Sequence, residues 1–199
     1  FSADRENHPD TFSVRRAGEV VCRFACRLPG EHMAANAAAA GILAHQLGVD
    51  WDGIGEALCS FRGLDRRMQH LGSPGGVTVV DDYGHHPTEI DATLRALRDH
   101  HLRGDRGADG RLICVFQPHQ HSRTRFLLEQ FASSFSTADL VIVPHIYFVR
   151  DSEEDRRAVS AADFVGELQQ RGVRALHIDA FHAIVAHLRE ECRAGDLLV

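Results

Sequence analysis

The chain contains no lysine, so arginine supplies all of its permanent positive side-chain charge. This absence excludes a phosphate-binding loop of the form Gly-x-x-x-x-Gly-Lys-(Ser/Thr), because that loop uses its lysine to contact nucleotide phosphates. A GC-rich genome would account for both the missing lysine and the abundance of alanine and arginine. Whatever the cause, these 199 residues cannot build such a loop by themselves.

Long apolar runs and an excess of positive charge are missing as well. No run approaches the about 20 residues that a transmembrane helix needs, and the first residues are too polar for a signal peptide. The net charge of −6 gives no reason to expect a nucleic-acid partner. With 44% hydrophobic and 25% charged residues the composition is typical of a globular protein, and we expect a cytoplasmic one without a membrane partner.

Cysteine is present, but without the spacing of a zinc site or a disulfide framework. The five cysteines, an odd number, lie among apolar neighbours at Cys22, Cys26, Cys59, Cys114 and Cys192. We predict that they are reduced thiols in the core. The adjacent residues His85 and His86 are poor metal ligands, because neighbouring side chains seldom converge, so we expect no metal site within this chain.

The chain begins at Phe1 rather than at a methionine, and it ends within the apolar run Leu197–Val199. Such a run predicts a buried strand. Because a domain rarely ends inside a core strand, we expect this chain to be a piece of a larger protein.

The first part of the chain is predicted to form a β-hairpin followed by two helices. The hairpin strands are Thr11–Arg15 and Val20–Cys26, which flank a glycine-containing turn. The Ala-rich segment Glu31–Leu47 and the segment Asp50–Phe61 are the predicted helices, with Asp50 as the N-cap of the second.

The polar, glycine-containing stretch Arg62–Arg67 predicts a domain boundary, which we place between a first domain, residues 1–65, and a second, residues 66–199. The predicted strands of the second domain are Val77–Val80, Leu112–Phe116, Leu140–Val143, Ala175–Ile178 and Leu197–Val199. Its predicted helices are Pro87–His101, Ser122–Phe135, Ser160–Arg171 and Phe181–Cys192. Apolar strands alternating with helices indicate an α/β fold, a Rossmann-like open, mostly parallel sheet with helices on both faces.

Ionisable side chains gather where the first two of these strands end, in Asp81–Glu89 and Phe116–Arg125. In a parallel sheet the carboxyl ends of the strands meet at one edge, where such folds bind ligands. With Ser122 as the predicted N-cap, Arg123 stands in the first helical turn, where a cation opposes the helix dipole. An arginine kept there indicates an anion-binding role. The alternatives are a solvated loop rich in histidine and a solvated arginine.

Both segments resemble the Mur ligase family, whose C-terminal domain carries Asp-Asp-Tyr-(Gly/Ala)-His-His-Pro-Thr-Glu and Phe-Gln-Pro-His-x-x-(Ser/Thr)-Arg-Thr. Weaker matches occur in family order at residues 30–36, 61–68 and 146–151. Tyr83 and Glu89 favour the branch that joins L-alanine to UDP-N-acetylmuramate, because the branch that attaches a recycled tripeptide more often has Phe and Ala there.

Three positions depart from the family pattern. The arginine that follows the histidine of the second motif is Gln120 here, the asparagine after His32 is Met33, and the acid before Ile146 is His145. The first departure leaves one substrate-facing positive charge missing or supplied from elsewhere.

The resemblance implies an ATP- and Mg²⁺-dependent ligation of L-alanine to UDP-N-acetylmuramate through an acyl phosphate, the first peptide step of peptidoglycan precursor synthesis. It implies that residues 1–65 are the end of the central ATP-binding domain and that residues 66–199 are most of the C-terminal, amino-acid-binding domain. Such a fragment would be inactive without the remaining N-terminal and central domains, and Arg62–Arg67 would be the hinge.

The resemblance also implies roles for individual residues. The catalytic residues would be His85, His119 and Arg123. Substrate contacts would come from Tyr83, His86 and Arg123, with Arg123 on the alanine carboxylate or the developing phosphate. Contacts to ATP would come from His32, Asn36, Arg67 and Asp82.

Two alternatives stay open. One is the tripeptide ligase of peptidoglycan recycling, within the same family. The other is a free-standing nucleotide-binding or regulatory module without catalysis. A lysine-bearing phosphate loop encoded upstream of Phe1 would favour a ligase over such a module.

Overall fold

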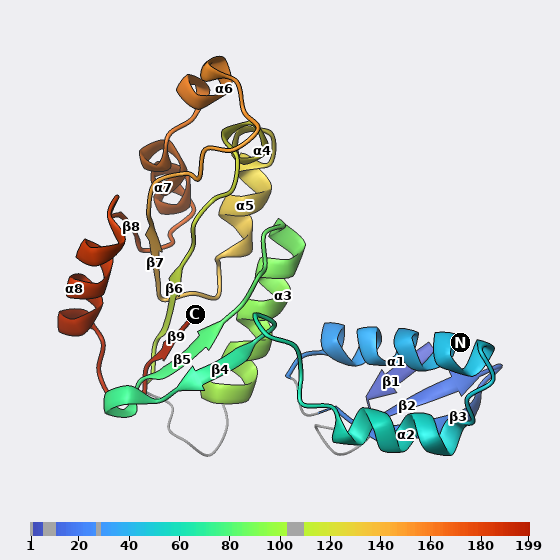
Figure 1. Ribbon diagram of the computed structural model, residues 1–199. Helices are drawn as coiled ribbons and strands as arrows, with labels where there is room; N and C mark the ends of the chain where they lie inside the picture. The colour runs from blue at the N-terminus through green and yellow to red at the C-terminus, as the bar shows by residue number, and fades with distance from the viewer. Residues whose placement is uncertain (1, 6–10, 27–28, 103–109) are drawn as a thin grey trace. The chain divides into compact units, whose positions relative to one another are not determined.

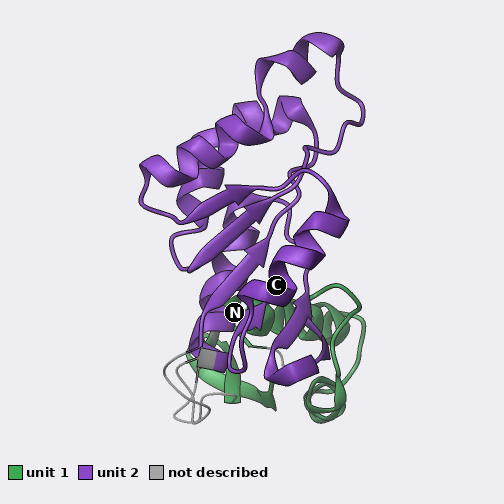
Figure 2. Cartoon of the chain, turned by 90° about the vertical axis from the view of Figure 1, so that its left-hand side faces the viewer, with its two compact units in different colours: residues 1–68 green, residues 69–199 purple. Residues whose placement is uncertain are grey.

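The computed structural model of the protein describes residues 2–5, 11–26, 29–102 and 110–199. The chain divides into two compact units, Phe1–Met68 and Gln69–Val199 (Figure 2). Each unit has its own sheet and is described by itself. Within the described ranges, no helix has the length and apolar character that crossing a membrane requires.

Unit 1 combines a three-stranded antiparallel sheet with two helices (Figure 1). Its elements are β1 (Ser2–Arg5), β2 (Thr11–Arg16), β3 (Glu19–Ala25), α1 (Glu31–Gln46) and α2 (Trp51–Ser60). The predicted hairpin is confirmed as β2 and β3, and β1 pairs with β2 as an additional edge strand. The N-cap of α2 is also confirmed, because Asp50 Oδ1 accepts a hydrogen bond from the N–H of Gly53 at 2.8 Å.

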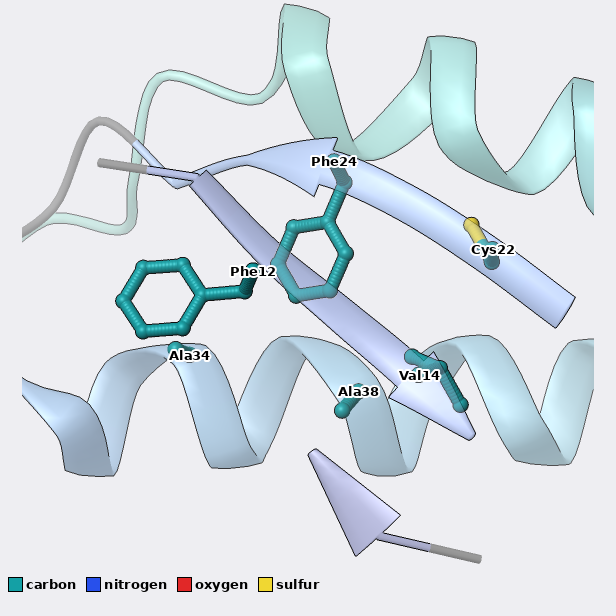
Figure 3. Packing of buried hydrophobic residues seen from close by; sticks show 6 residues of the cluster. All are labelled: Phe12, Val14, Cys22, Phe24, Ala34 and Ala38. Atoms are coloured by element: carbon teal, nitrogen blue, oxygen red, sulfur yellow. The ribbon is translucent and has the colours of Figure 1, made fainter. Parts of the chain in front are cut away.

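The core of unit 1 lies between the sheet and its helices (Figure 3). The rings of Phe12 and Phe24 stack with centroids 6.0 Å apart. Buried Ala34 and Ala38 give α1 a flat, narrow face against these side chains. The helices also approach closely, since a Cβ on Gly41 would lie 2.9 Å from Ile54 Cγ2. Small residues on α1 therefore set its distance from the sheet and from α2.

Unit 2 is built on a six-stranded sheet with the strand order β4-β5-β9-β6-β7-β8. The strands are β4 (Gln69–Gly72), β5 (Thr78–Asp81), β6 (Leu112–Val115), β7 (Leu140–Val143), β8 (Ala175–His177) and β9 (Leu197–Leu198). Only β4 pairs antiparallel, at the edge, and β9 pairs in parallel with both β5 and β6. The predicted open, mostly parallel sheet is confirmed.

Helices cover both faces of this sheet, as predicted (Figure 1). The helices of unit 2 are α3 (Pro87–Leu97), α4 (His121–Phe126), α5 (Leu128–Ser134), α6 (Glu153–Ala158), α7 (Ala161–Gln170) and α8 (Phe181–Glu191). On one face, Ile184 of α8 packs on Ile113 and Ile142. On the other, Phe116 contacts Phe131 of α5 and Phe164 of α7, with ring centroids 5.6 and 6.0 Å apart. Alternate residues of each strand thus serve opposite faces.

Some predicted elements need correction. The helix predicted over Pro87–His101 ends at Leu97 and continues as a π-helical turn, η2 (Arg98–Leu102). The helix predicted over Ser122–Phe135 is two helices, because Leu127 at φ −107° interrupts it. Ser122 is not the N-cap; α4 begins at His121, and Gln120 occupies the cap position.

In unit 2, three short elements were not among those predicted. They are the edge strand β4, the 3₁₀ turn η1 (Pro74–Gly76) that connects it to β5, and the helix α6. The sequence of β4 is mostly polar residues and glycine, so the hydrophobic pattern did not indicate a strand there. A short edge strand forms without an apolar run. The helix α6 is fixed by a capping box between Ser152 and Asp155.

Candidate functional site

The predicted site lies at the carboxyl edge of the sheet of unit 2. The loops that follow β5, β6 and β7 there carry Asp82–His86, Gln117–Gln120 and His145–Asp151. In Figure 1 the chain after β6 and β7 runs to the end of the unit where α4 and α6 lie, and these two helices contact each other. Three sequence segments therefore meet at one edge.

Asp82 shapes the loop after β5. Its Oδ1 accepts hydrogen bonds from the N–H of Gly84 at 2.7 Å and from the hydroxyl of Thr93 at 3.4 Å. A Cβ on Gly84 would lie 2.8 Å from the same oxygen, so an alanine here would require the Asp82 carboxylate to shift. Burial, and then the negative charge of Asp82, raise the pKa of Cys114 to about 12. The thiol of Cys114 is therefore protonated and inert, as predicted for a core cysteine.

His85 is held by the residues on either side of it. Its ring lies 5.4 Å from that of Tyr83, and its Nδ1 lies 3.1 Å from the Tyr83 carbonyl oxygen. Glu89 on α3 accepts the backbone N–H of His85 at 3.0 Å and lies 3.4 Å from Nδ1. These contacts engage Nδ1 and fix the orientation of the ring.

His86 is used differently. Its Nδ1 accepts a hydrogen bond from the N–H of Thr88 at 3.3 Å, and His86 is the N-cap of α3. The ring of His86 therefore has a structural role, and its predicted contact with substrate, together with Tyr83 and Arg123, stays a prediction.

His119 lies where the loops after β6 and β7 meet. Its ring stacks on that of Tyr147, with centroids 4.7 Å apart and an interplanar angle of 27°. Desolvation lowers the pKa of His119, and the positive charges of Arg123 and His85 lower it further. Arg123 and His85 thus both lie within electrostatic reach of His119, and His119 is neutral over a wider pH range than a free histidine.

Two backbone hydrogen bonds join the loop after β6 to the loop after β7. The N–H of Tyr147 donates to the Pro118 carbonyl at 2.9 Å, and the N–H of Gln120 donates to the Tyr147 carbonyl at 3.1 Å. The side chain of Gln120 donates to the Val149 carbonyl at 3.4 Å. Gln120, the main departure from the family pattern, is therefore bound to the neighbouring loop. Its backbone is in the left-handed region at φ +72°.

Asp151 and Tyr147 are site residues to which the sequence assigned no role. Asp151 accepts hydrogen bonds from the N–H groups of His121 and Ser122 and from the Ser122 hydroxyl. Burial alone would raise the pKa of Asp151, but these hydrogen bonds outweigh it and lower the pKa. The place of both residues could have been predicted, because they follow β7 at the same edge of the sheet as the motifs around His85 and His119.

The predicted nucleotide contacts do not form one site within either unit. His32 and Asn36 lie one turn apart near the start of α1, and Arg67 follows α2, all in unit 1. Asp82 belongs to unit 2. No group of three or more His, Cys, Asp or Glu side chains that could hold a metal ion occurs in the part of the chain that the structure describes.

Comparisons with known proteins agree with the geometry. The family model described as "Mur ligase, glutamate ligase domain" matches residues 66–199. A curated relative from Caldanaerobacter subterraneus subsp. tengcongensis, named UDP-N-acetylmuramate–L-alanine ligase, is 40% identical over 189 residues. That alignment covers 95% of this chain and 39% of the relative, so the chain spans about two fifths of the relative's length.

Solved structures show the same fold. A UDP-N-acetylmuramate–alanine ligase from Thermotoga maritima superposes with a TM-score of 0.69 at 23% identity, covering 94% of this chain and 38% of that one. A murein peptide ligase from Psychrobacter arcticus gives 0.67 at 22% identity, covering 99% and 40%. With the family match spanning more than half of its residues, this chain belongs to the Mur ligase family.

Proposed function

We propose that the full-length protein carrying this chain joins L-alanine to UDP-N-acetylmuramate at the expense of ATP, in the cytoplasm. The observation that carries the proposal is the convergence of His85, His119 and Arg123 at the carboxyl edge of the sheet, in a member of the Mur ligase family. The name of the curated relative at 40% identity supports alanine as the amino acid.

In the proposed reaction a carboxylate oxygen of the muramoyl group attacks the γ-phosphorus of ATP, and ADP leaves. The unprotonated amine of alanine then attacks the carbonyl carbon of the acyl phosphate. The C–N bond forms, the C–O bond to phosphate breaks, inorganic phosphate leaves and the nitrogen gives up one proton. Holding both reactants in one complex removes much of the entropic barrier to the second step.

The side chains at this edge of the sheet suit the second step, the attack of the alanine amine on the acyl phosphate. The guanidinium of Arg123 has the planar, bidentate geometry that carboxylates and phosphates favour. His119, kept neutral by its lowered pKa, has a ring nitrogen that accepts a hydrogen bond or a proton from the attacking amine. Tyr83 and His85 flank the same space after β5. We propose that Arg123 holds the alanine carboxylate or the developing phosphate and that the other three position the amine.

ATP and Mg²⁺ require more than these residues. The chain lacks the lysine of a phosphate loop, and its described residues do not form a metal-binding group. We therefore propose that the remaining N-terminal and central domains of the full-length protein hold Mg²⁺ and most of the ATP phosphates. His32, Asn36 and Arg67 of this chain would add contacts to the nucleotide, and Asp82 would meet the ribose.

Two other functions predict different behaviour. A tripeptide ligase is nearly as similar in fold, so Tyr83, Glu89 and the curated relative, rather than the fold, favour alanine. A non-catalytic nucleotide-binding module would bind ligands without turnover.

Ligation by the full-length protein is the test. UDP-N-acetylmuramate, ATP and Mg²⁺ are supplied with either L-alanine or the recycled tripeptide, and phosphate release and product mass are followed. We expect a product heavier by one alanine residue and little product with the tripeptide. Preference for the tripeptide would establish the second ligase, and nucleotide binding without any product would establish the module.

A further inference from the structure

The loop after β7 is tied to the site through Asp151. We propose that Asp151 is a positioning residue that clamps the first turn of α4 and thereby holds Arg123 beside His119. The clamp rests on hydrogen-bond geometry, the nearness of Arg123 to His119 rests on the effect of its charge on the pKa of that histidine, and the consequence for turnover rests on the proposed function.

A single carboxylate forms the clamp. Asp151 Oδ2 accepts the N–H of His121 at 2.6 Å, and Oδ1 accepts the N–H of Ser122 at 3.2 Å and the Ser122 hydroxyl at 2.5 Å. The first N–H groups of a helix have no partner inside the helix, and a negative charge beside them is favourable. Asp151 therefore performs the capping task that the sequence assigned to Ser122, from a loop about 30 residues away.

The helix α4 depends on such ties because it has only six residues. Helices this short are not stable by propensity alone, so tertiary contacts decide where they lie. A second tie to another segment is the hydrogen bond between His121 Nδ1 and the Val159 carbonyl, 2.9 Å, whereas the Thr124 hydroxyl bonds locally to the carbonyl of the N-cap residue Gln120 at 2.7 Å. Arg123 follows Ser122 directly, so it moves with the clamped turn.

Backbone conformation on both sides of the clamp supports the proposal. Gln120, just before α4, has φ +72°, and Arg150, just before Asp151, has φ +56°. Residues with a side chain rarely adopt these angles, and they persist where the surrounding structure enforces them. The hydrogen bonds to Asp151 join the two segments, together with those that Gln120 donates to the Tyr147 and Val149 carbonyls.

The position of Arg123 can be read from the titration of His119. The charges of Arg123 on α4 and His85 in the loop after β5 act on His119, and Tyr147 in the loop after β7 stacks on its ring. Losing the negative charge of Asp151 would by itself lower the pKa of His119, whereas losing the nearby positive charge of Arg123 would raise it. A rise in the pKa therefore cannot come from the missing carboxylate; it reports either displacement of Arg123 or hydration of the His119 ring. The two are distinguished in the Arg123→Ala background, where Asp151→Ala should add no further rise if it acts by displacing Arg123.

The first experiment titrates His119 by NMR in the 199-residue chain, with His119→Gln to assign the signal. We expect the wild-type pKa to lie below 6.5 and Asp151→Ala to raise it toward that value, as Arg123→Ala does. Asp151→Asn keeps one acceptor oxygen and should give a smaller rise in a chain that still folds. An unchanged or lower pKa in both Asp151 variants would overturn the proposal.

The matched control is Asp155→Ala. Asp155 also accepts a hydrogen bond from a serine hydroxyl, that of Ser152 at 2.7 Å, and from the Ser152 N–H at 3.3 Å, but it caps α6. This variant should leave the pKa of His119 unchanged. An equal rise in both variants would mean that any loosening of this end of the unit moves Arg123, and the specific role of Asp151 would be rejected.

The second experiment uses turnover by the full-length ligase. Asp151→Ala should lower kcat by about 10- to 100-fold, since displacing a site residue by about 1 Å has effects of this size. In the Arg123→Ala background the same change should add less than about twofold, because the residue it positions is gone. If the two substitutions together lowered kcat by the product of their separate factors, Asp151 would act independently of Arg123, and the positioning role would be contradicted. If the wild-type protein has no ligase activity, the proposed function fails, and the titration still decides the role of Asp151.

Discussion

Two arginines on α4 differ in their surroundings although they are close in sequence. Arg123 is half-buried and its charge reaches His119, whereas Arg125 is exposed. Loss of a charge-assisted contact to a carboxylate or phosphate costs about 2–4 kcal/mol, so Arg123→Ala should lower kcat/KM of the full-length ligase by about 30- to 1,000-fold. Arg125→Ala should lower it by less than about threefold. Steady-state kinetics of both variants would reveal a wrong assignment if the losses were equal.

Arg150 provides a backbone prediction at the residue scale. Its φ of +56° is unfavourable for a residue with a Cβ, and glycine removes that penalty but gains freedom in the unfolded chain. The net effect of Arg150→Gly should be a rise of up to about 1 kcal/mol in the free energy of unfolding. Arg157→Gly, inside α6, should lower it by about 1 kcal/mol. Urea titrations that gave both variants the same sign would contradict this account.

At the scale of elements, the two-residue strand β9 is held in the middle of the sheet by a buried ion pair. The side chain of Asp196, just before β9, is fully buried. It accepts hydrogen bonds from Arg111 Nη2 at 2.7 Å and from the N–H groups of Arg111 and Arg193, both at 3.0 Å. Arg111 also contacts Glu191 at the end of α8. This network joins the start of β6 to the segment that leads into β9.

Breaking the network should be costly. Arg111→Ala leaves the buried carboxylate of Asp196 without its cation, which should lower the free energy of unfolding by about 3–5 kcal/mol. Arg95→Ala removes a partner of Asp91 in an exposed pair on α3 and should cost less than about 1 kcal/mol. Urea unfolding compares them, and similar losses would mean that burial does not set the strength of the Arg111 pair.

The same carboxylate predicts a pH dependence. Burial alone would raise the pKa of Asp196, but hydrogen bonds from Arg111 and from backbone N–H groups lower it below its value in the unfolded chain. The unfolded state then binds the proton more readily, so this stabilisation is present above about pH 4 and is lost as the pH falls through the folded pKa. Unfolding free energies between about pH 2 and 6 should therefore fall less steeply in Asp196→Asn than in the wild type. Equal slopes would contradict the assignment.

For the whole molecule, we expect the 199-residue chain to have no ATPase or ligase activity of its own, because it lacks the lysine that contacts nucleotide phosphates. Phosphate release with UDP-N-acetylmuramate and L-alanine measures this, with the full-length protein as the positive control. Turnover above the buffer blank, in a preparation free of host ligase, would show that the chain carries a complete site.

The two units should also differ as independent folding units. Residues 69–199 form a larger unit with a covered six-stranded sheet, and larger units bury a greater fraction of their surface. Expressed alone, they should keep the amide NMR spectrum that they have in the full chain and unfold cooperatively. A collapsed spectrum would mean that unit 2 depends on unit 1 for its stability.

Local patterns in the sequence determined much of this protein. The apolar runs of β5 to β9, the hairpin of β2 and β3 and the N-cap at Asp50 follow from residue type and spacing within one short segment. The rule that parallel strands end at one edge was enough to bring together the motifs around His85 and His119.

The tertiary structure decided what depends on residues far apart in the chain. The place of β9 between β5 and β6, the break at Leu127 and the capping of α4 by Asp151 have no local signature. Strand order depends on which apolar faces the helices cover, and a helix can be capped by any carboxylate that the fold delivers to its first turn. Ser122 looked like the cap in sequence because it is the nearest hydroxyl, but Asp151 accepts the bonds because it carries charge and two acceptor oxygens.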